Sequence, residues 1–237
     1  MRVRPASIAA VLLAICMLGA CGSPDTPSPT SAAAGGKTTP QNETNQEKNT
    51  RNDTCTDSQW DATRPETAPR VEWNYQRETL WPYPTSEELG PYLADSDGYR
   101  RCYAHSPSGA VLAAANIAAM MTDPTLMTNS DSVGKLFGRG SRYEEIREKL
   151  RSETLSSKTN SGVRSELYGF RILESNETTA IIDLGYQASA DGRGLNLSIV
   201  YNLVRDNGDW KLQSEPTSPI SSSALSSFVN YTPWREA

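Results

Sequence analysis

The second half of the chain alternates apolar and polar residues with the two-residue period that is typical of β-strands. The clearest stretch places Leu195, Leu197, Ile199, Tyr201 and Leu203 on one side of the chain, with largely polar residues between them. Clusters of Ser, Asn, Asp and Gly separate this stretch from three similar ones. The predicted strands are 165–174, 178–188, 195–205 and 210–213. Because the turns between them are short, we expect an antiparallel four-stranded meander with one buried face.

A helical pattern comes before the strands. Residues 107–121 are apolar almost all round, with Ser106 suited to the N-cap and Pro107 to the first turn. Residues 122–124, Thr-Asp-Pro, end this helix. A helix that is apolar on every side must be enclosed by its own domain.

Two shorter helices are predicted between this helix and the first strand. Residues 126–137 form a weaker helical stretch that Gly134 interrupts. Residues 142–152 form a charged helix, and Ser141 with Glu144 match a capping box at its start. Helices followed by a meander of strands predict an α+β fold.

Aromatic residues and prolines are mixed in the segment before the first helix. Those in 55–104 include Trp60, Trp73, Tyr75, Trp81, Pro82, Tyr83, Pro84, Pro91 and Tyr92. We interpret this segment as an extended cover over the core, in preference to an exposed proline-rich docking arm. The tail, 214–237, keeps Phe228, Tyr231 and Trp234, so its end should pack back on the domain.

The N-terminus has the layout of an export signal. Arg2 and Arg4 precede the apolar run 8–17, which is too short to span a bilayer, since a membrane helix needs about 20 apolar residues. Leu18-Gly19-Ala20-Cys21 follows and resembles the bacterial lipobox, whose cysteine receives a diacylglyceryl group. The alternative is an ordinary secretory signal that is cut further on, after Ala32-Ala33-Ala34. We therefore expect attachment to membrane lipid through Cys21, on the extracytoplasmic face of the cell membrane.

Composition defines the rest of the mature chain. Residues 22–54 contain no Val, Ile, Leu, Met or aromatic residue and should form a disordered tether. Loss of the signal, which carries two arginines and no acid, changes the formal charge from −5 to −7. An acidic chain gives no reason to expect nucleic acid as a partner. The predicted parts are a signal peptide (1–20), a lipidated cysteine and tether (21–54), an aromatic extension (55–106), an α+β domain (107–217) and a tail (218–237).

The order of elements in 107–213, helices and then a long antiparallel meander, resembles the cone-shaped fold of the nuclear transport factor family, which steroid isomerases and scytalone dehydratase share. The motif His105-Ser106-Pro107-Ser108-Gly109-Ala110, together with Gly208-Asp209-Trp210-Lys211-Leu212 downstream, resembles a group of actinobacterial exported proteins. Related cone-shaped modules also occur in conjugative and type IV secretion machines. The resemblance implies a fold and a compartment, and it adds no chemistry.

Two cysteines remain once the signal is removed and Cys21 carries the lipid. Cys55 and Cys102 should form a disulfide in an oxidising compartment. A metal site is disfavoured because His105 is the only histidine and no CxxC spacing occurs. The sequence predicts no cofactor.

Candidate chemistry is sparse, and no nucleophile-elbow, HExxH or phosphate-binding motif occurs. A site inside a cone could use Asp183 and His105, with three tyrosines at its walls: Tyr168, Tyr186 and Tyr201. Asp183 alternates with Ile182 and Leu184, so we expect it on the solvent side of the sheet. The tyrosines should belong to the core. His105 could help to hold an anion at the helix start, but a hydrogen bond from its ring to a backbone carbonyl is the preferred interpretation.

Two functions from different classes follow. The first is a non-enzymatic lipoprotein that binds or assembles with a protein partner of the cell envelope, such as a secretion or conjugation machine. The second is a protein that binds or modifies a small apolar molecule inside the cone. A cavity with converging polar groups would favour the second.

Overall fold

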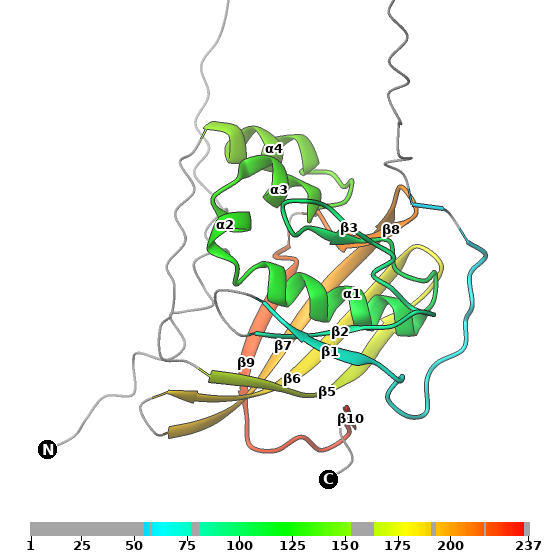
Figure 1. Cartoon of the computed structure of the whole chain (residues 1–237), viewed down its shortest axis with the longest axis vertical. Coiled ribbons are helices and arrows are strands. Elements are labelled where there is room, and N and C mark those ends of the chain that lie inside the picture. The colour runs from blue at the N-terminus through cyan, green and yellow to red at the C-terminus, as the bar shows by residue number, and fades with distance from the viewer. Residues whose placement is uncertain are drawn as a thin grey trace, which may run out of the picture.

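The computed structural model describes residues 55–56, 58–76, 81–152, 164–190, 193–215 and 217–234. The predicted export signal, the predicted lipidation site Cys21 and the predicted tether lie outside the described residues. The fold is α+β, with a few short helices packed against an antiparallel sheet (Figure 1).

The four predicted strands are confirmed. They are β5 (Arg164–Ser175), β6 (Thr179–Ala190), β7 (Arg193–Asp206) and β8 (Asp209–Leu212), each antiparallel to the next. The turn between β7 and β8 places Asn207 at φ 52° and Gly208 at φ 73°. Two consecutive positive φ angles are those of the tight turn whose twist matches paired strands.

The sheet is larger than the predicted four-stranded meander, because the C-terminal tail adds two strands. β9 (Ile220–Leu225) pairs with β7, and β10 (Thr232–Pro233) pairs with β5, which makes the sheet six-stranded. β8 pairs with 203–206 of β7 and β9 with 196–201, so both lie on the same side of this long strand. β9 was not predicted because its sequence, ISSSAL, lacks the apolar alternation of a half-buried strand.

The first helix is confirmed as α1 (Pro107–Met120), where the Ser106 side chain accepts a hydrogen bond from the Gly109 N–H. The weaker helical stretch is two short helices, α2 (Pro124–Met127) and α3 (Ser130–Lys135). The charged helix is α4 (Tyr143–Ser152). The predicted capping box between Ser141 and Glu144 is wrong. The Ser141 N–H and hydroxyl donate hydrogen bonds to Glu215 instead.

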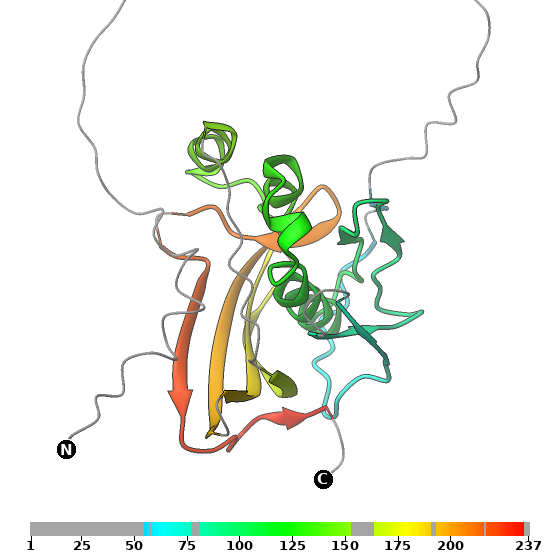
Figure 2. The same ribbon diagram turned by 60° about the vertical axis from the view of Figure 1, so that its left-hand side comes forward.

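The helix α1 is apolar on every side because it is the middle of three layers, between the sheet and the aromatic segment (Figure 2). The sheet covers one side of the helix. The other side is covered by the hairpin of β1 (Glu72–Tyr75) and β2 (Pro82–Thr85), near the short pair β3 (Leu93–Ala94) and β4 (Arg100–Arg101). The aromatic segment is therefore a cover that contains two small hairpins. Asn116 is buried in α1 and bonds to this cover, since its Nδ2 lies 2.8 Å from the Pro84 carbonyl oxygen.

None of the helices in the described part of the chain combines the length and apolarity that crossing a membrane requires.

Candidate functional site

Asp183 lies in the middle of β6 and is completely buried, with 0% of its surface exposed. The prediction that it faces solvent is therefore wrong. Its alternation with Ile182 and Leu184 does place it on the face opposite α1, as expected. That face is covered at Asp183 by Arg171 of β5 and by Tyr231, which precedes β10.

The carboxylate of Asp183 receives donors from three neighbouring segments. Its Oδ2 accepts from Arg171 Nε at 3.0 Å, from Nη2 of the same guanidinium, and from the Tyr231 hydroxyl at 2.7 Å. Its Oδ1 accepts from the Ser198 hydroxyl of β7 at 2.7 Å. We call these four residues the Asp183 network.

The charges in the Asp183 network are those of an ion pair between Arg171 and Asp183. The hydrogen bond to Asp183 raises the pKa of Arg171 above its ordinary value. Burial raises the pKa of Tyr231. A general base needs a free oxygen within reach of a substrate proton, whereas both oxygens of Asp183 are already occupied by donors from the protein itself.

Two glycines make room for the C-terminal segment beside this network. Gly169 and Gly185 are paired across β5 and β6. A Cβ at Gly185 would lie 2.9 Å from the rings of Phe228 and Tyr231, and one at Gly169 would lie 2.3 Å from the Thr232 carbonyl oxygen. Because these two glycines have no side chain, the C-terminal segment can pack directly on the backbone of β5 and β6. Tyr168, the extra residue of a β-bulge, stacks on the Phe228 ring with centroids 4.1 Å apart.

His105 is buried at the start of α1 and joins three segments. Its Nδ1 lies 2.7 Å from the carbonyl oxygen of Ser58, and its Nε2 lies 2.7 Å from that of Glu177. The ring also packs near Trp60 and Trp210, with centroids 5.2 Å and 6.1 Å away. These contacts agree with the preferred interpretation, in which the ring bonds to backbone.

Tyr186 and Tyr201 lie on the α1 face of the sheet and belong to the core, as expected. The same expectation is wrong for Tyr168, which is half-buried and stacks on Phe228 because the β-bulge takes it out of the alternation. The Tyr186 ring packs against Trp81, with centroids 5.1 Å apart. Burial raises the pKa of both phenols, which keeps them neutral at physiological pH. The five candidate residues therefore lie in three places: the Asp183 face, the start of α1 and the core.

Three residues of the Asp183 network were not predicted from the sequence: Arg171, Ser198 and Tyr231. Arg171 and Ser198 stand opposite or diagonal to Asp183 in the strand register, so a correct register would have identified them as neighbours. Tyr231 reaches Asp183 only because the C-terminal tail folds back over the sheet. No local sequence pattern predicts the path of that tail.

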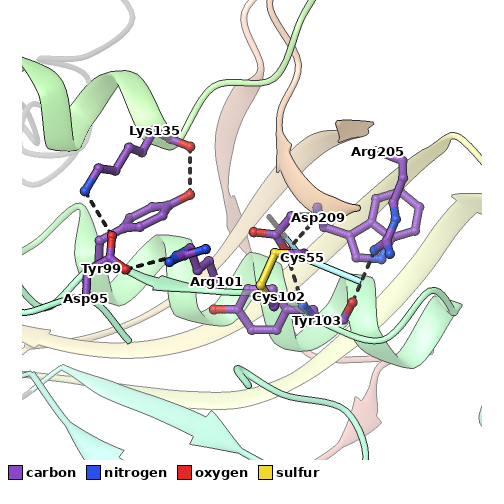
Figure 3. The surroundings of a disulfide bond; sticks show 10 residues. Cys55, Asp95, Tyr99, Arg101, Cys102, Tyr103, Lys135, Arg205 and Asp209 are labelled. Carbon is purple, nitrogen blue, oxygen red and sulfur yellow. Dashed lines mark hydrogen bonds and ion pairs between the residues drawn. A yellow bond between two sulfur atoms is a disulfide. The ribbon is translucent and has the colours of Figure 1, made fainter. Parts of the chain in front are cut away.

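The predicted disulfide is present between Cys55 and Cys102, close to a second buried carboxylate (Figure 3). Asp209 accepts hydrogen bonds from the backbone N–H groups of Tyr103, at 3.1 Å, and Trp210, at 3.0 Å. Burial raises the pKa of Asp209 despite these donors. The Asp209 contacts hold the segment that carries Cys102 against the start of β8.

This raised pKa predicts how Asp209 affects stability as the pH changes. The contribution of Asp209 should be fully present below its unfolded-state pKa of about 3.9 and should be lost as pH rises through its higher folded-state pKa. Urea unfolding of the wild type and Asp209→Asn, measured between about pH 3 and pH 7, isolates this carboxyl. We expect the wild type to lose stability relative to the variant as pH rises; a constant or opposite difference would contradict the assignment.

Two open recesses lie on the surface of the described part of the chain. One, of about 310 Å³, lies between α3, α4 and β8 and has three cationic residues in its lining: Lys135, Arg147 and Lys211. The Nζ atom of Lys135 lies 3.0 Å from Asp95 Oδ2, and that of Lys211 lies 3.5 Å from Asp206 Oδ2. These two carboxylates offset much of the positive charge of the recess. The other, of about 430 Å³, is lined by residues of β5, β6 and β7. Neither is lined by α1.

Among the described residues, no group of three or more His, Cys, Asp or Glu side chains could hold a metal ion.

The chain belongs to the family of the domain of unknown function DUF8175, whose profile matches residues 29–233. The match begins within the predicted tether and extends to β10, so it includes the disulfide and the Asp183 network. No curated protein matches the chain. No solved structure matches it either.

Proposed function

We propose that this protein is a lipid-anchored, non-enzymatic binding module on the extracytoplasmic face of a bacterial cell membrane. The lipobox-like Cys21 would hold it to the membrane, and the tether would carry the domain away from the surface. Its partner would be a protein of the cell envelope, such as a component of a secretion or conjugation machine.

One observation carries the non-enzymatic part of this proposal. The two groups best suited to acid–base chemistry are Asp183 and His105. In both, the polar side-chain atoms form contacts that hold the fold together. Catalysis by either group would require these contacts to break. A binding surface makes no such demand.

The alternative is a ligand held inside a nuclear transport factor-like cone, between α1 and the sheet. The side chains in that space include Leu112, Ile182 and Tyr186, which are completely buried. Trp81 packs on Tyr186 from the cover. This packing supports a filled interior and therefore favours the binding module.

Replacement of Cys21 tests the anchor. Cys21→Ser removes the thiol that would accept the diacylglyceryl group, and we expect the protein to move from the membrane fraction to the soluble extracytoplasmic fraction. Cys16→Ser is the matched control, because Cys16 lies in the signal and should not affect fractionation. The intact mass of the wild type should also exceed that of the cleaved chain by the mass of the lipid. Unchanged membrane association of Cys21→Ser would overturn the proposal.

A further inference from the structure

Among the described residues, no strand pairs with the outer side of β9. The Asn202 N–H donates to the Pro219 carbonyl oxygen at 2.8 Å, so this pair is hydrogen-bonded. Hydrogen-bonded pairs alternate along antiparallel strands, and the register therefore directs the backbone of Ser221, Ser223 and Leu225 toward β7. The N–H and C=O groups of Ser222 and Ala224 must point outward.

Nothing in the described ranges pairs with these outward groups, since β7 is the one described strand that contacts β9 in the sheet. Residues 221–224 are all exposed. Protein edge strands are usually protected by lysine, proline, a bulge or an inward charge. β9 has none of these, and no charged residue occurs anywhere in 217–234.

We propose that β9 pairs antiparallel with β9 of a second copy of this chain, across a two-fold axis near Ser223. In this arrangement Ser222 of each copy faces Ala224 of the other, and their outward backbone groups form the hydrogen bonds. A two-fold interface uses the same surface patch twice, so that patch must tolerate its own copy. The small, uncharged side chains of β9 meet this condition.

Charge and side-chain size favour a second copy over a foreign strand. With the signal removed the chain carries a formal charge of −7, so two copies repel each other through their net charge and can meet most easily along an uncharged segment. Selection of a foreign strand relies on pockets for its alternate side chains. A row of serines and one alanine offers no such pockets, and it makes pairing depend on the backbone.

The pairing should be weak in dilute solution and effective on a membrane. An edge of six residues buries less than the roughly 1,000 Å² expected of a stable interface. Attachment to one surface raises the effective concentration of the copies. This step rests on the proposed lipid anchor.

Cysteine cross-linking in membranes tests the pairing with the full-length chain. Two Ser223 residues would face each other at a non-hydrogen-bonded position, where Cα atoms are about 4.5 Å apart, within the range that a disulfide spans. After mild oxidation, Ser223→Cys should give a disulfide-linked dimer at several times the yield of Ser96→Cys. Ser96 is also an exposed serine and lies in the β3–β4 turn, so it reports collisions that do not depend on β9.

A second variant asks whether the backbone of β9 is required. Ser222→Pro in the Ser223→Cys background removes an outward N–H group without removing a bond to β7, and proline is tolerated in edge strands. We expect a several-fold lower dimer yield. An unchanged thermal unfolding midpoint would show that the domain remains folded.

Three results would overturn the pairing: equal yields from Ser223→Cys and Ser96→Cys, a Ser223→Cys product linked to a different protein, or a yield that Ser222→Pro leaves unchanged in a folded domain. Fractionation of the same cells separates this failure from failure of the anchor. An anchored protein without excess cross-linking refutes the pairing alone, and a soluble protein refutes the anchor.

Discussion

Asp183→Ala is expected to lower the free energy of unfolding by about 3 kcal/mol, at the low end of the range for breaking a buried ion pair. The substitution removes the acceptor of Arg171, Ser198 and Tyr231 at once. The low end applies because the Arg171 side chain is 33% exposed and can be hydrated again. Urea unfolding followed by tryptophan fluorescence measures the loss.

Two variants make this prediction specific to the network. Tyr231→Phe removes one of the donors and should cost about 1.5 kcal/mol, because the acceptor is a charged carboxylate. Glu174→Ala removes an exposed carboxylate from β5 and should change stability by less than about 0.5 kcal/mol. If Asp183→Ala were no more destabilising than Glu174→Ala, the network would not hold the tail on the sheet.

Removal of the disulfide should have the largest effect on stability. The bond closes a loop with a sequence separation of 47 residues, and loss of a loop of this size costs about 4 kcal/mol on the chain-entropy model. We expect this loss in the double variant Cys55→Ala, Cys102→Ala, measured by urea unfolding without reductant. A difference below about 1 kcal/mol would mean that the cover is held by its other contacts alone.

The backbone conformation at Cys102 allows a control for the disulfide experiment, through the choice of the residue that replaces this cysteine. Cys102 has φ 68°, a left-handed conformation that costs a residue with a Cβ about 1 kcal/mol and that glycine adopts freely. The variant Cys55→Ala, Cys102→Gly should therefore be about 1 kcal/mol more stable than the double alanine variant. Equal stabilities would show that this conformation relaxes once the bond is lost.

The sequence predicted the elements whose signals are local. Alternation identified β5 to β8 to within a few residues, because a strand with one buried face repeats every two residues. Ser106 and Pro107 marked the start of α1 because capping depends on only a few neighbouring residues. Cys55 and Cys102 were paired by elimination, which required no geometry.

The remaining features depend on contacts between distant segments. Alternation assigned Asp183 to the face away from α1, but it could not show that Tyr231 and Arg171 cover that face. Bulges near Tyr168 and Leu173 shift the pairing of β5 with β6, so the register could not be counted from the turn alone. β9 is a strand because β7 offers it an edge, which its own residues do not indicate.

The position of Cys55 has a mechanical consequence. Tension that arrives from upstream enters the described domain at this residue, and the disulfide passes it directly to Cys102 beside α1 and β8. Gly208 lies against the same point, since a Cβ there would come within 2.6 Å of the Cys55 carbonyl oxygen. The force therefore bypasses both hairpins of the cover, which a pull from the N-terminus would otherwise peel away one strand at a time. Under load, the pull should therefore reach the start of α1 before it can act on either hairpin.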